Sequence, residues 1–164
     1  MLEKLNFLMF SLKNKTIIVT GATGYLGKEI CHGISEYGAD VAVCSTSSDN
    51  AISFANKLCQ KFGNKCKGYV LDLNNFDSIS NVIQKILEDF GKIDCLINNA
   101  HFGEKCTIDD LTKETWDKGL NGTITSTVFM VKYCAKYLEK TKGSIINISS
   151  IYGIVSPKPS VYVD

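Results

Sequence analysis

The chain has 164 residues, of which 45% are apolar and 21% are charged, and its formal net charge is +1. These values are ordinary for one globular domain with a substantial core. All 18 basic residues are scattered lysines, which argues against a nucleic-acid partner, because phosphate backbones need a concentrated basic face and base edges favour arginine. No apolar stretch approaches the ~20 residues that span a bilayer, so we expect no membrane partner and a cytoplasmic location.

Seven cysteines are spread along the chain without a C-x-x-C pair, and several lie within apolar runs such as "VAVCS" and "IDCLI". This pattern is typical of small buried thiols in a reducing compartment. The two histidines, His32 and His101, are too few to complete a zinc cluster with them, so no metal site is expected.

Short β-branched and apolar runs recur along the chain and predict strands. These runs lie at residues 16–20, 40–44, 67–71, 92–97 and 143–149.

Apolar residues at helical spacing fill the intervals between the predicted strands. The first three helical patterns end at Gly38, Gly63 and Gly91, which suit left-handed C-caps. A long helical region is expected between residues 109 and 141, with Thr112 as its N-cap and with glycines interrupting it near Asn121.

The alternation of strand and helix predicts an α/β fold with a parallel sheet covered on both faces. Right-handed crossovers favour a doubly wound (Rossmann) sheet, in which about five strands take the order 3-2-1-4-5. We expect an N-terminal extension over residues 1–11, a dinucleotide-binding domain over 12–155 and the start of a substrate-side loop over 156–164.

The stretch "TGATGYLG", residues 20–27, places three glycines between the first predicted strand and the first predicted helix. Glycines there permit a tight turn and a close approach of the backbone to a pyrophosphate. The free N–H groups and the positive end of the helix dipole then face the anion. A turn that merely feeds the helix is the alternative, and the strand and helix on either side favour the phosphate site.

Five stretches in order resemble segments of the short-chain dehydrogenase/reductase family, and the resemblance covers residues 12–155. They are "LKNKTIIVTGATGYLG", "LDLNN", "LINNA", "WDKGLNGT" and "GSIINISS". The resemblance implies an NAD(P)-dependent oxidoreductase that transfers a hydride between nicotinamide and a small carbonyl or alcohol substrate. It also implies a homo-oligomeric parent protein, a dimer or a tetramer.

The resemblance assigns a cofactor role to residues at the ends of the first four strands. It implies that Asp72 bonds the adenine, with helix entry as the alternative, and that "LINNA" holds its strand against the cofactor loop, with turn formation as the alternative. The residues expected to bind the cofactor are Gly21, Thr23, Gly24, Tyr25, Leu26, Gly27, Ser45, Thr46, Asp72, Leu73, Asn99 and Ala100.

The same resemblance places catalytic groups at Asn121 and Ser150. The glycines beside Asn121 suit a distorted helix that frees a backbone carbonyl for a proton-relay water, and an incidental kink is the alternative. The Ser150 hydroxyl would donate a hydrogen bond to a developing alkoxide, and Ser149 is expected on the opposite face of the strand.

Three departures from the family pattern stand out. The spacing at Gly24 and Tyr25 resembles nucleotide-sugar epimerases, although the other motifs favour the single-domain reductases. His101 follows "NNA" where relatives usually have glycine, and it is expected to be a loop side chain beside the site rather than a catalyst. The family's acid is a tyrosine with a lysine four residues later, but Ser156 follows Tyr152 at that spacing and Tyr162 has no such partner.

Ser45 and Thr46 stand where NAD-binding relatives tend to have a carboxylate, so the sequence favours NADP, with NAD as the alternative. The tyrosine–lysine pair is either missing or lies beyond these 164 residues, so we expect the 164-residue chain alone, as the N-terminal portion of a reductase, to be inactive. Two other functions stay open: a non-catalytic dinucleotide-binding domain and an epimerase-like protein.

Overall fold

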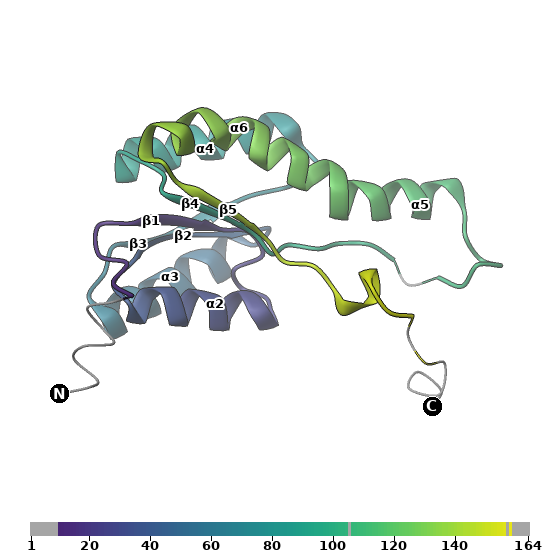
Figure 1. Ribbon diagram of the computed structural model, residues 1–164, viewed down its shortest axis with the longest axis horizontal. Coiled ribbons are helices and arrows are strands. Elements are labelled where there is room, and N and C mark those ends of the chain that lie inside the picture. The colour runs from purple at the N-terminus through teal and green to yellow at the C-terminus, as the bar shows by residue number, and fades with distance from the viewer. Residues whose placement is uncertain (1–9, 105, 157, 159–164) are drawn as a thin grey trace.

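The computed structural model describes residues 10–104, 106–156 and 158. It contains a five-stranded parallel sheet in the order β3-β2-β1-β4-β5, which confirms the predicted doubly wound fold and strand order (Figure 1). Helices α4 and α6 lie along one face of the sheet, and α2 and α3 lie along the other (Figure 1).

The strands are short and all begin within a few residues of their predicted positions. They are β1 (Thr16–Val19), β2 (Asp40–Ser45), β3 (Cys66–Val70), β4 (Cys95–Asn98) and β5 (Ser144–Asn147). The helices are α2 (Tyr25–Glu36), α3 (Ser48–Phe62), α4 (Phe76–Phe90), α5 (Lys113–Leu120), a π-helix η1 (Asn121–Thr125), α6 (Ser126–Thr141) and a 3₁₀ turn η2 (Ile151–Gly153).

Two apolar cores lie on opposite faces of the sheet. Along β1, Ile18 packs into the core beneath α4 and α6, whereas Ile17 and Val19 pack into the core beneath α2 and α3. Because side chains alternate across a strand, a central strand covered on both faces is expected to be apolar on both of them, as Ile17, Ile18 and Val19 of β1 are.

Local signals that end and begin helices behave as the sequence predicts. Gly63 and Gly91 are left-handed C-caps with φ of 74° and 79°, and Gly38, directly after the C-cap of α2, has φ of 95°. Thr112 caps α5 and forms a reciprocal capping box with Thr115. The helical region therefore begins at Lys113 and not at residue 109, because the preceding residues form a turn and then the cap.

Two predicted strands differ from those observed by more than one residue. The run 92–97 yields β4 only from Cys95, because the chain is still leaving the helix end at Gly91. The run 143–149 yields β5 only to Asn147, after which the chain turns toward η2.

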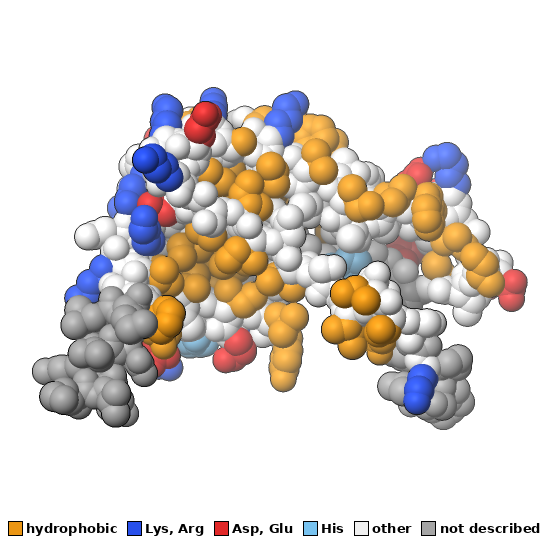
Figure 2. Space-filling view, in the orientation of Figure 1, with side chains coloured by type: hydrophobic (Ala, Val, Ile, Leu, Met, Phe, Trp, Pro, Cys, Tyr) orange, Lys and Arg blue, Asp and Glu red, His pale blue; other side chains and the backbone are white. Residues whose placement is uncertain are grey.

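Helices lie on both faces of the sheet, as predicted, but they leave its β5 edge exposed (Figure 1). All four residues of β5 are exposed, including Ile145 and Ile146, which are 41% and 46% accessible. Figure 2 shows apolar side chains gathered on the face of the molecule that carries this edge. Within the described part of the chain, no helix is long and apolar enough to cross a membrane.

The predicted terminal segments fall largely outside the described residues. Of the expected extension over 1–11, the structure describes residues 10 and 11, and of the expected loop over 156–164, it describes residues 156 and 158. Tyr162 also lies outside the described residues.

Candidate functional site

The N-terminus of α2 differs from those of the other helices that follow a loop. Ser47, Asn75 and Thr112 each cap their own helix by accepting a backbone N–H, at the starts of α3, α4 and α5. Gly24 begins α2 without a side-chain cap, and the first turn of α2 carries no acidic residue. The first N–H groups of α2 and the positive end of its dipole are therefore available to an anion.

The three glycines of the β1–α2 loop serve different structural purposes. Gly21 has φ of 61°, and a Cβ built there would lie 2.9 Å from the Cα of Ala100. A Cβ on Gly27 would lie 2.2 Å from the carbonyl oxygen of Gly21. Gly24 has ordinary extended backbone, and its Cβ would meet only that same oxygen, at 3.2 Å. Gly21 and Gly27 are thus required for packing within the protein, whereas Gly24 is left facing a cavity.

This cavity, of about 520 Å³, lies at the carboxyl ends of β1, β2, β3 and β4. Every residue that the sequence predicts to bind the cofactor lines it. The lining also contains residues that the sequence interpretation did not assign to the cofactor: Cys44, Leu71, Asn74, His101 and Phe102. The ends of neighbouring strands could have indicated them, because parallel strands deliver their next residues to one edge of the sheet.

The segment "NNA" ties the end of β4 to the glycine loop. The Thr20 hydroxyl accepts the backbone N–H groups of Asn99 and Ala100, each at 3.0 Å. The Asn99 amide donates to the carbonyl oxygens of Thr20 and Gly21, at 3.0 and 3.2 Å. These bonds fix the wall of the cavity on the β4 side. Thr20, which the sequence interpretation did not single out, positions this segment through its hydroxyl.

Polar groups at the ends of β2 and β3 form the opposite wall. The hydroxyls of Thr23 and Ser45 lie 2.8 Å apart, and Thr46 is exposed beside them. Asp72 accepts the backbone N–H of Asn74 at 2.9 Å, so it does shape the entry to α4 while it also lines the cavity. The helix-entry function and a ligand-binding function are therefore compatible at Asp72.

A second cavity, of about 650 Å³, lies between β4, β5 and η1, and it contains both Ser149 and Ser150. The predicted separation of these serines onto opposite faces is not seen, because β5 ends at Asn147 and the strand alternation ends with it. Ser150 accepts the backbone N–H of Tyr152 at 3.2 Å, which leaves its hydroxyl hydrogen free for another acceptor. The floor of the cavity is braced by the amide of Asn98, which donates to the Asn147 side chain at 2.9 Å.

The predicted helix distortion at Asn121 is present as the π-helix η1, which begins at that residue. Within η1, Gly122 allows a close backbone contact, because a Cβ there would lie 1.8 Å from the carbonyl oxygen of Phe102. The β4–α5 loop thus rests directly on the helix backbone. Asn121 is exposed and does not line either cavity, so the structure does not bring it to Ser150.

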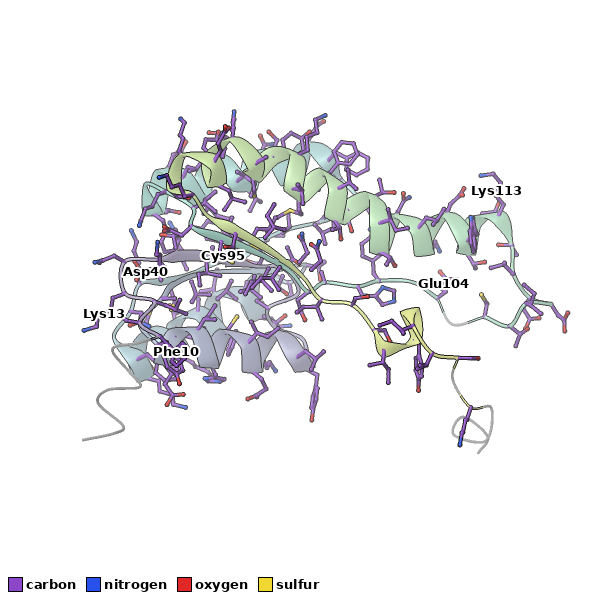
Figure 3. The ribbon with its side chains drawn as sticks, viewed as in Figure 1. Phe10, Lys13, Asp40, Cys95, Glu104 and Lys113 are labelled. Carbon is purple, nitrogen blue, oxygen red and sulfur yellow. The ribbon has the colours of Figure 1, made fainter. Side chains whose placement is uncertain are left out.

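The loop and helix after β4 project beyond the sheet as an arm. Figure 3 shows Glu104 on the extended segment that leaves β4, and Lys113 at the start of α5. The arm places one wall of the second cavity, Thr123 and Ile124, on η1 rather than on the sheet. The cavity wall on this side therefore depends on the position of η1.

The known proteins that resemble the chain decide its family. The family model for short chain dehydrogenases matches residues 15–163. The chain belongs to the short-chain dehydrogenase family.

Three relatives illustrate this membership. The chain is 34% identical over 155 residues to an NADP-dependent mannitol dehydrogenase of Alternaria alternata, covering 92% of this chain and 58% of the relative. It is 30% identical over 144 residues to a 3-oxoacyl-[acyl-carrier-protein] reductase of Thermotoga maritima, covering 87% of this chain and 58% of the relative. An NADPH-dependent 3-quinuclidinone reductase from Rhodotorula rubra has a similar structure, with a TM-score of 0.85, 31% identity and coverage of 92% and 58%. The chain therefore spans less than two thirds of the length of these relatives.

The cysteines of this short-chain dehydrogenase chain fit the prediction of buried thiols. Cys31, Cys44, Cys66 and Cys134 are buried, and Cys106 is exposed. Burial raises the pKa of Cys134 to about 12, and burial together with the nearby Cys66 raises the pKa of Cys31 to about 12. Thiols held in this protonated state are poor nucleophiles and metal ligands, so their contribution is to packing.

Proposed function

We propose that the chain binds a nicotinamide dinucleotide in the cavity at the carboxyl ends of β1 to β4. The uncapped N-terminus of α2 carries the proposal, because it supplies free N–H groups and positive dipole beside Gly24, where a phosphate group would need them. Asp72 stands on the β3 side of that turn and Ala100 on the β4 side, so the two halves of a dinucleotide would extend in opposite directions from α2.

The cavity suits such a ligand in its size and chemistry. Its volume of about 520 Å³ lies in the range of small-molecule sites, roughly 300–1,000 Å³. The hydroxyls of Thr23, Ser45 and Thr46 and the carboxylate of Asp72 provide polar groups beside apolar ones such as Leu26, Leu71 and Leu73. Gly24 allows the ligand to approach the backbone closely.

NADP(H) is the favoured form of the cofactor. No carboxylate follows β2 at Ser45 or Thr46, so nothing there repels a 2′-phosphate, and the exposed Thr46 hydroxyl can bond one. The mannitol dehydrogenase and the quinuclidinone reductase described above are named as NADP- and NADPH-dependent, which supports the same choice.

The proposed reaction is the reduction of a small carbonyl compound, or the oxidation of the corresponding alcohol. The bound cofactor supplies or accepts the hydride. The Ser150 hydroxyl, at the edge of the second cavity, would donate a hydrogen bond to the substrate oxygen as negative charge develops on it. Asn121, the other catalytic residue that the family resemblance implies, would act through its exposed side chain, because its backbone carbonyl accepts the N–H of Ser126.

A non-catalytic dinucleotide-binding protein is the second candidate. It is favoured by one sequence observation: none of the tyrosines from Tyr25 to Tyr152 has a lysine four residues later. Both candidates require the same cofactor site, so binding is the first property to measure.

The test is a calorimetric titration of the 164-residue chain with NADPH, compared with a Gly24→Val variant. We expect the variant to lose at least about tenfold in affinity, because the added side chain enters the cavity, while its melting temperature stays nearly unchanged. Gly33→Ala is the matched control, since Gly33 lies in α2 with open space around it. Equal NADPH affinity in the wild-type chain and the Gly24→Val variant, or no NADPH binding by the wild-type chain, would overturn the proposal.

A further inference from the structure

His101 occupies a position that the two cavities share. It lines the cavity beside α2 as well as the cavity that contains Ser150. It follows the end of β4, and β4 lies on the opposite side of β1 from β2 and β3. A dinucleotide centred on the N-terminus of α2, with its adenine toward Asp72, would therefore extend its nicotinamide half toward His101.

The backbone around His101 is fixed on both sides. Before it, the Ala100 N–H is bonded to the Thr20 hydroxyl at 3.0 Å. After it, the carbonyl of Phe102 lies against Gly122, with no room for a Cβ between them. The position of His101 is thus set by β1 on one side and by η1 on the other.

The imidazole itself is anchored by one nitrogen. Its Nδ1 lies 3.2 Å from the hydroxyl oxygen of Thr123, a residue of η1. Among the hydrogen bonds of the described residues, none engages Nε2 of His101. Thr123 can donate to Nδ1 or accept from it, so Nε2 is a donor in one tautomer and an acceptor in the other. The hydroxyls and the carboxamide of a nicotinamide riboside contain both kinds of partner.

We propose that His101 binds the nicotinamide half of the cofactor through Nε2, with Thr123 as its positioning residue. This inference rests on the proposed function. In this assignment η1 has two roles. It packs on the β4–α5 loop, and it orients the His101 side chain toward the nicotinamide ring that exchanges the hydride. His101 is a binding residue in this assignment, and no proton transfer is ascribed to it.

The two histidines of the chain make a direct test possible. Histidine-labelled chain is examined by NMR with NADP⁺ and, separately, with adenosine 2′,5′-bisphosphate, which lacks the nicotinamide half. His32 is an internal control, because it packs against Phe54 and Phe62 beneath the sheet. We expect the His101 ring signals to shift with NADP⁺ but not with the bisphosphate, and the His32 signals to shift with neither.

Affinities provide a second readout. His101→Ala and Thr123→Val should each weaken NADP⁺ binding by about 3- to 10-fold, as the loss of one hydrogen bond does, and leave the affinity for adenosine 2′,5′-bisphosphate unchanged. Thr127→Val is the matched control, because the Thr127 hydroxyl lines the Ser150 cavity but donates to the Thr123 carbonyl and not to the ring.

The possible outcomes distinguish a failure of the His101 assignment from a failure of the proposed cofactor site. Equal His101 shifts with both ligands, or NADP⁺ binding that neither shifts His101 nor depends on it, would overturn the role of His101 while the cofactor site stands. Binding of neither ligand would overturn the cofactor site, and the role of His101 with it.

Discussion

The region from β1 to β4 and the region from α5 to η2 are built differently. In the first region β1, β2 and β4 are buried on both faces, and the residues at their carboxyl ends are held together by hydrogen bonds such as those of Thr20. In the second region α6 buries one face, through Met130, Cys134 and Leu138, against the core of the first region, and all of β5 is exposed. The proposed cofactor site therefore lies among buried strands, whereas β5 and the segment after it lie at an exposed edge.

The proposed substrate site lies in the other region, where apolar surface remains accessible. Ile148, Ile151 and Ile154 are 43%, 71% and 91% exposed on the segment that contains Ser150. The proposed cofactor site therefore has buried strands around it, whereas the proposed substrate site lies beside exposed apolar surface. Substitutions among the buried strands should cost stability or cofactor binding, whereas equivalent substitutions in β5 and the segment after it should cost little.

The largest effect is expected in the glycine loop. Gly27→Val places a Cβ 2.2 Å from the Gly21 carbonyl oxygen, where only backbone surrounds it, so we expect a loss of about 3 kcal/mol or more in the free energy of unfolding. Gly33→Ala, one and a half turns further along α2, meets open space and should stabilise the chain by about 0.5–1 kcal/mol. Urea denaturation of both variants checks this pair, and equal stabilities would contradict the packing role of Gly27.

A pair of adjacent isoleucines compares the two regions directly. Ile97 of β4 and Ile146 of β5 are partners in the sheet, but Ile97 is 4% exposed and Ile146 is 46% exposed. Ile97→Thr should destabilise the chain by about 2–3 kcal/mol, because it leaves a hydroxyl in an apolar core. Ile146→Thr should cost less than about 0.5 kcal/mol.

The same Ile146→Thr variant should also reduce self-association, because it makes an exposed sheet edge more polar. Light scattering across a concentration series measures this effect. A large loss of stability at Ile146 would mean that β5 belongs to the same cooperative core as β4.

A buried carboxylate should make the stability of the first region depend on pH. Burial alone would raise the pKa of Asp94, but the Thr16 N–H at 2.9 Å and ion pairs with Lys92 and Lys15, at 3.0 and 3.2 Å, outweigh it and lower the pKa. Because the pKa of Asp94 is lower in the folded state, its ionised carboxylate stabilises the fold at pH values above the unfolded-state pKa, near 3.9. This stabilisation is lost as the pH falls through the folded-state pKa.

Asp94→Asn should therefore cost about 2 kcal/mol near neutral pH, and the difference from wild type should shrink as pH falls below about 4. Denaturation of both proteins at a series of pH values measures this difference. A difference that does not change with pH would contradict the role of the ionised carboxylate.

The sequence was sufficient to predict the sheet order, because it depends on local patterns. The family resemblance assigned Ser45, Asp72 and Asn99 to one site, and the fold brings them to one cavity because residues at the carboxyl ends of parallel strands arrive at one edge of the sheet. The glycines that end α3 and α4 could also be placed from local patterns, since each acts on its own helix.

Contacts between distant segments could not be predicted in this way. The close contact of Phe102 with Gly122 depends on how the arm lies against β4, and the hydrogen bond between Asn98 and Asn147 depends on how β5 lies against it. No periodic pattern in the sequence encodes either arrangement. The sequence alone also does not distinguish the three loop glycines. In the structure Gly21 and Gly27 serve internal packing, whereas Gly24 faces the cavity.

Hydrogen exchange of the backbone amides, with and without NADPH, tests most directly whether the cofactor site lies at the carboxyl ends of the buried strands. Without ligand, the amides of β1, β2 and β4 should exchange far more slowly than those of η2, because only the former are buried. With NADPH, added protection should be confined to the first turn of α2 and the segments that line its cavity, residues 21–27, 44–46, 71–74 and 99–102. Protection that instead appears across η2 and the exposed edge, with none at the start of α2, would contradict the proposed cofactor site.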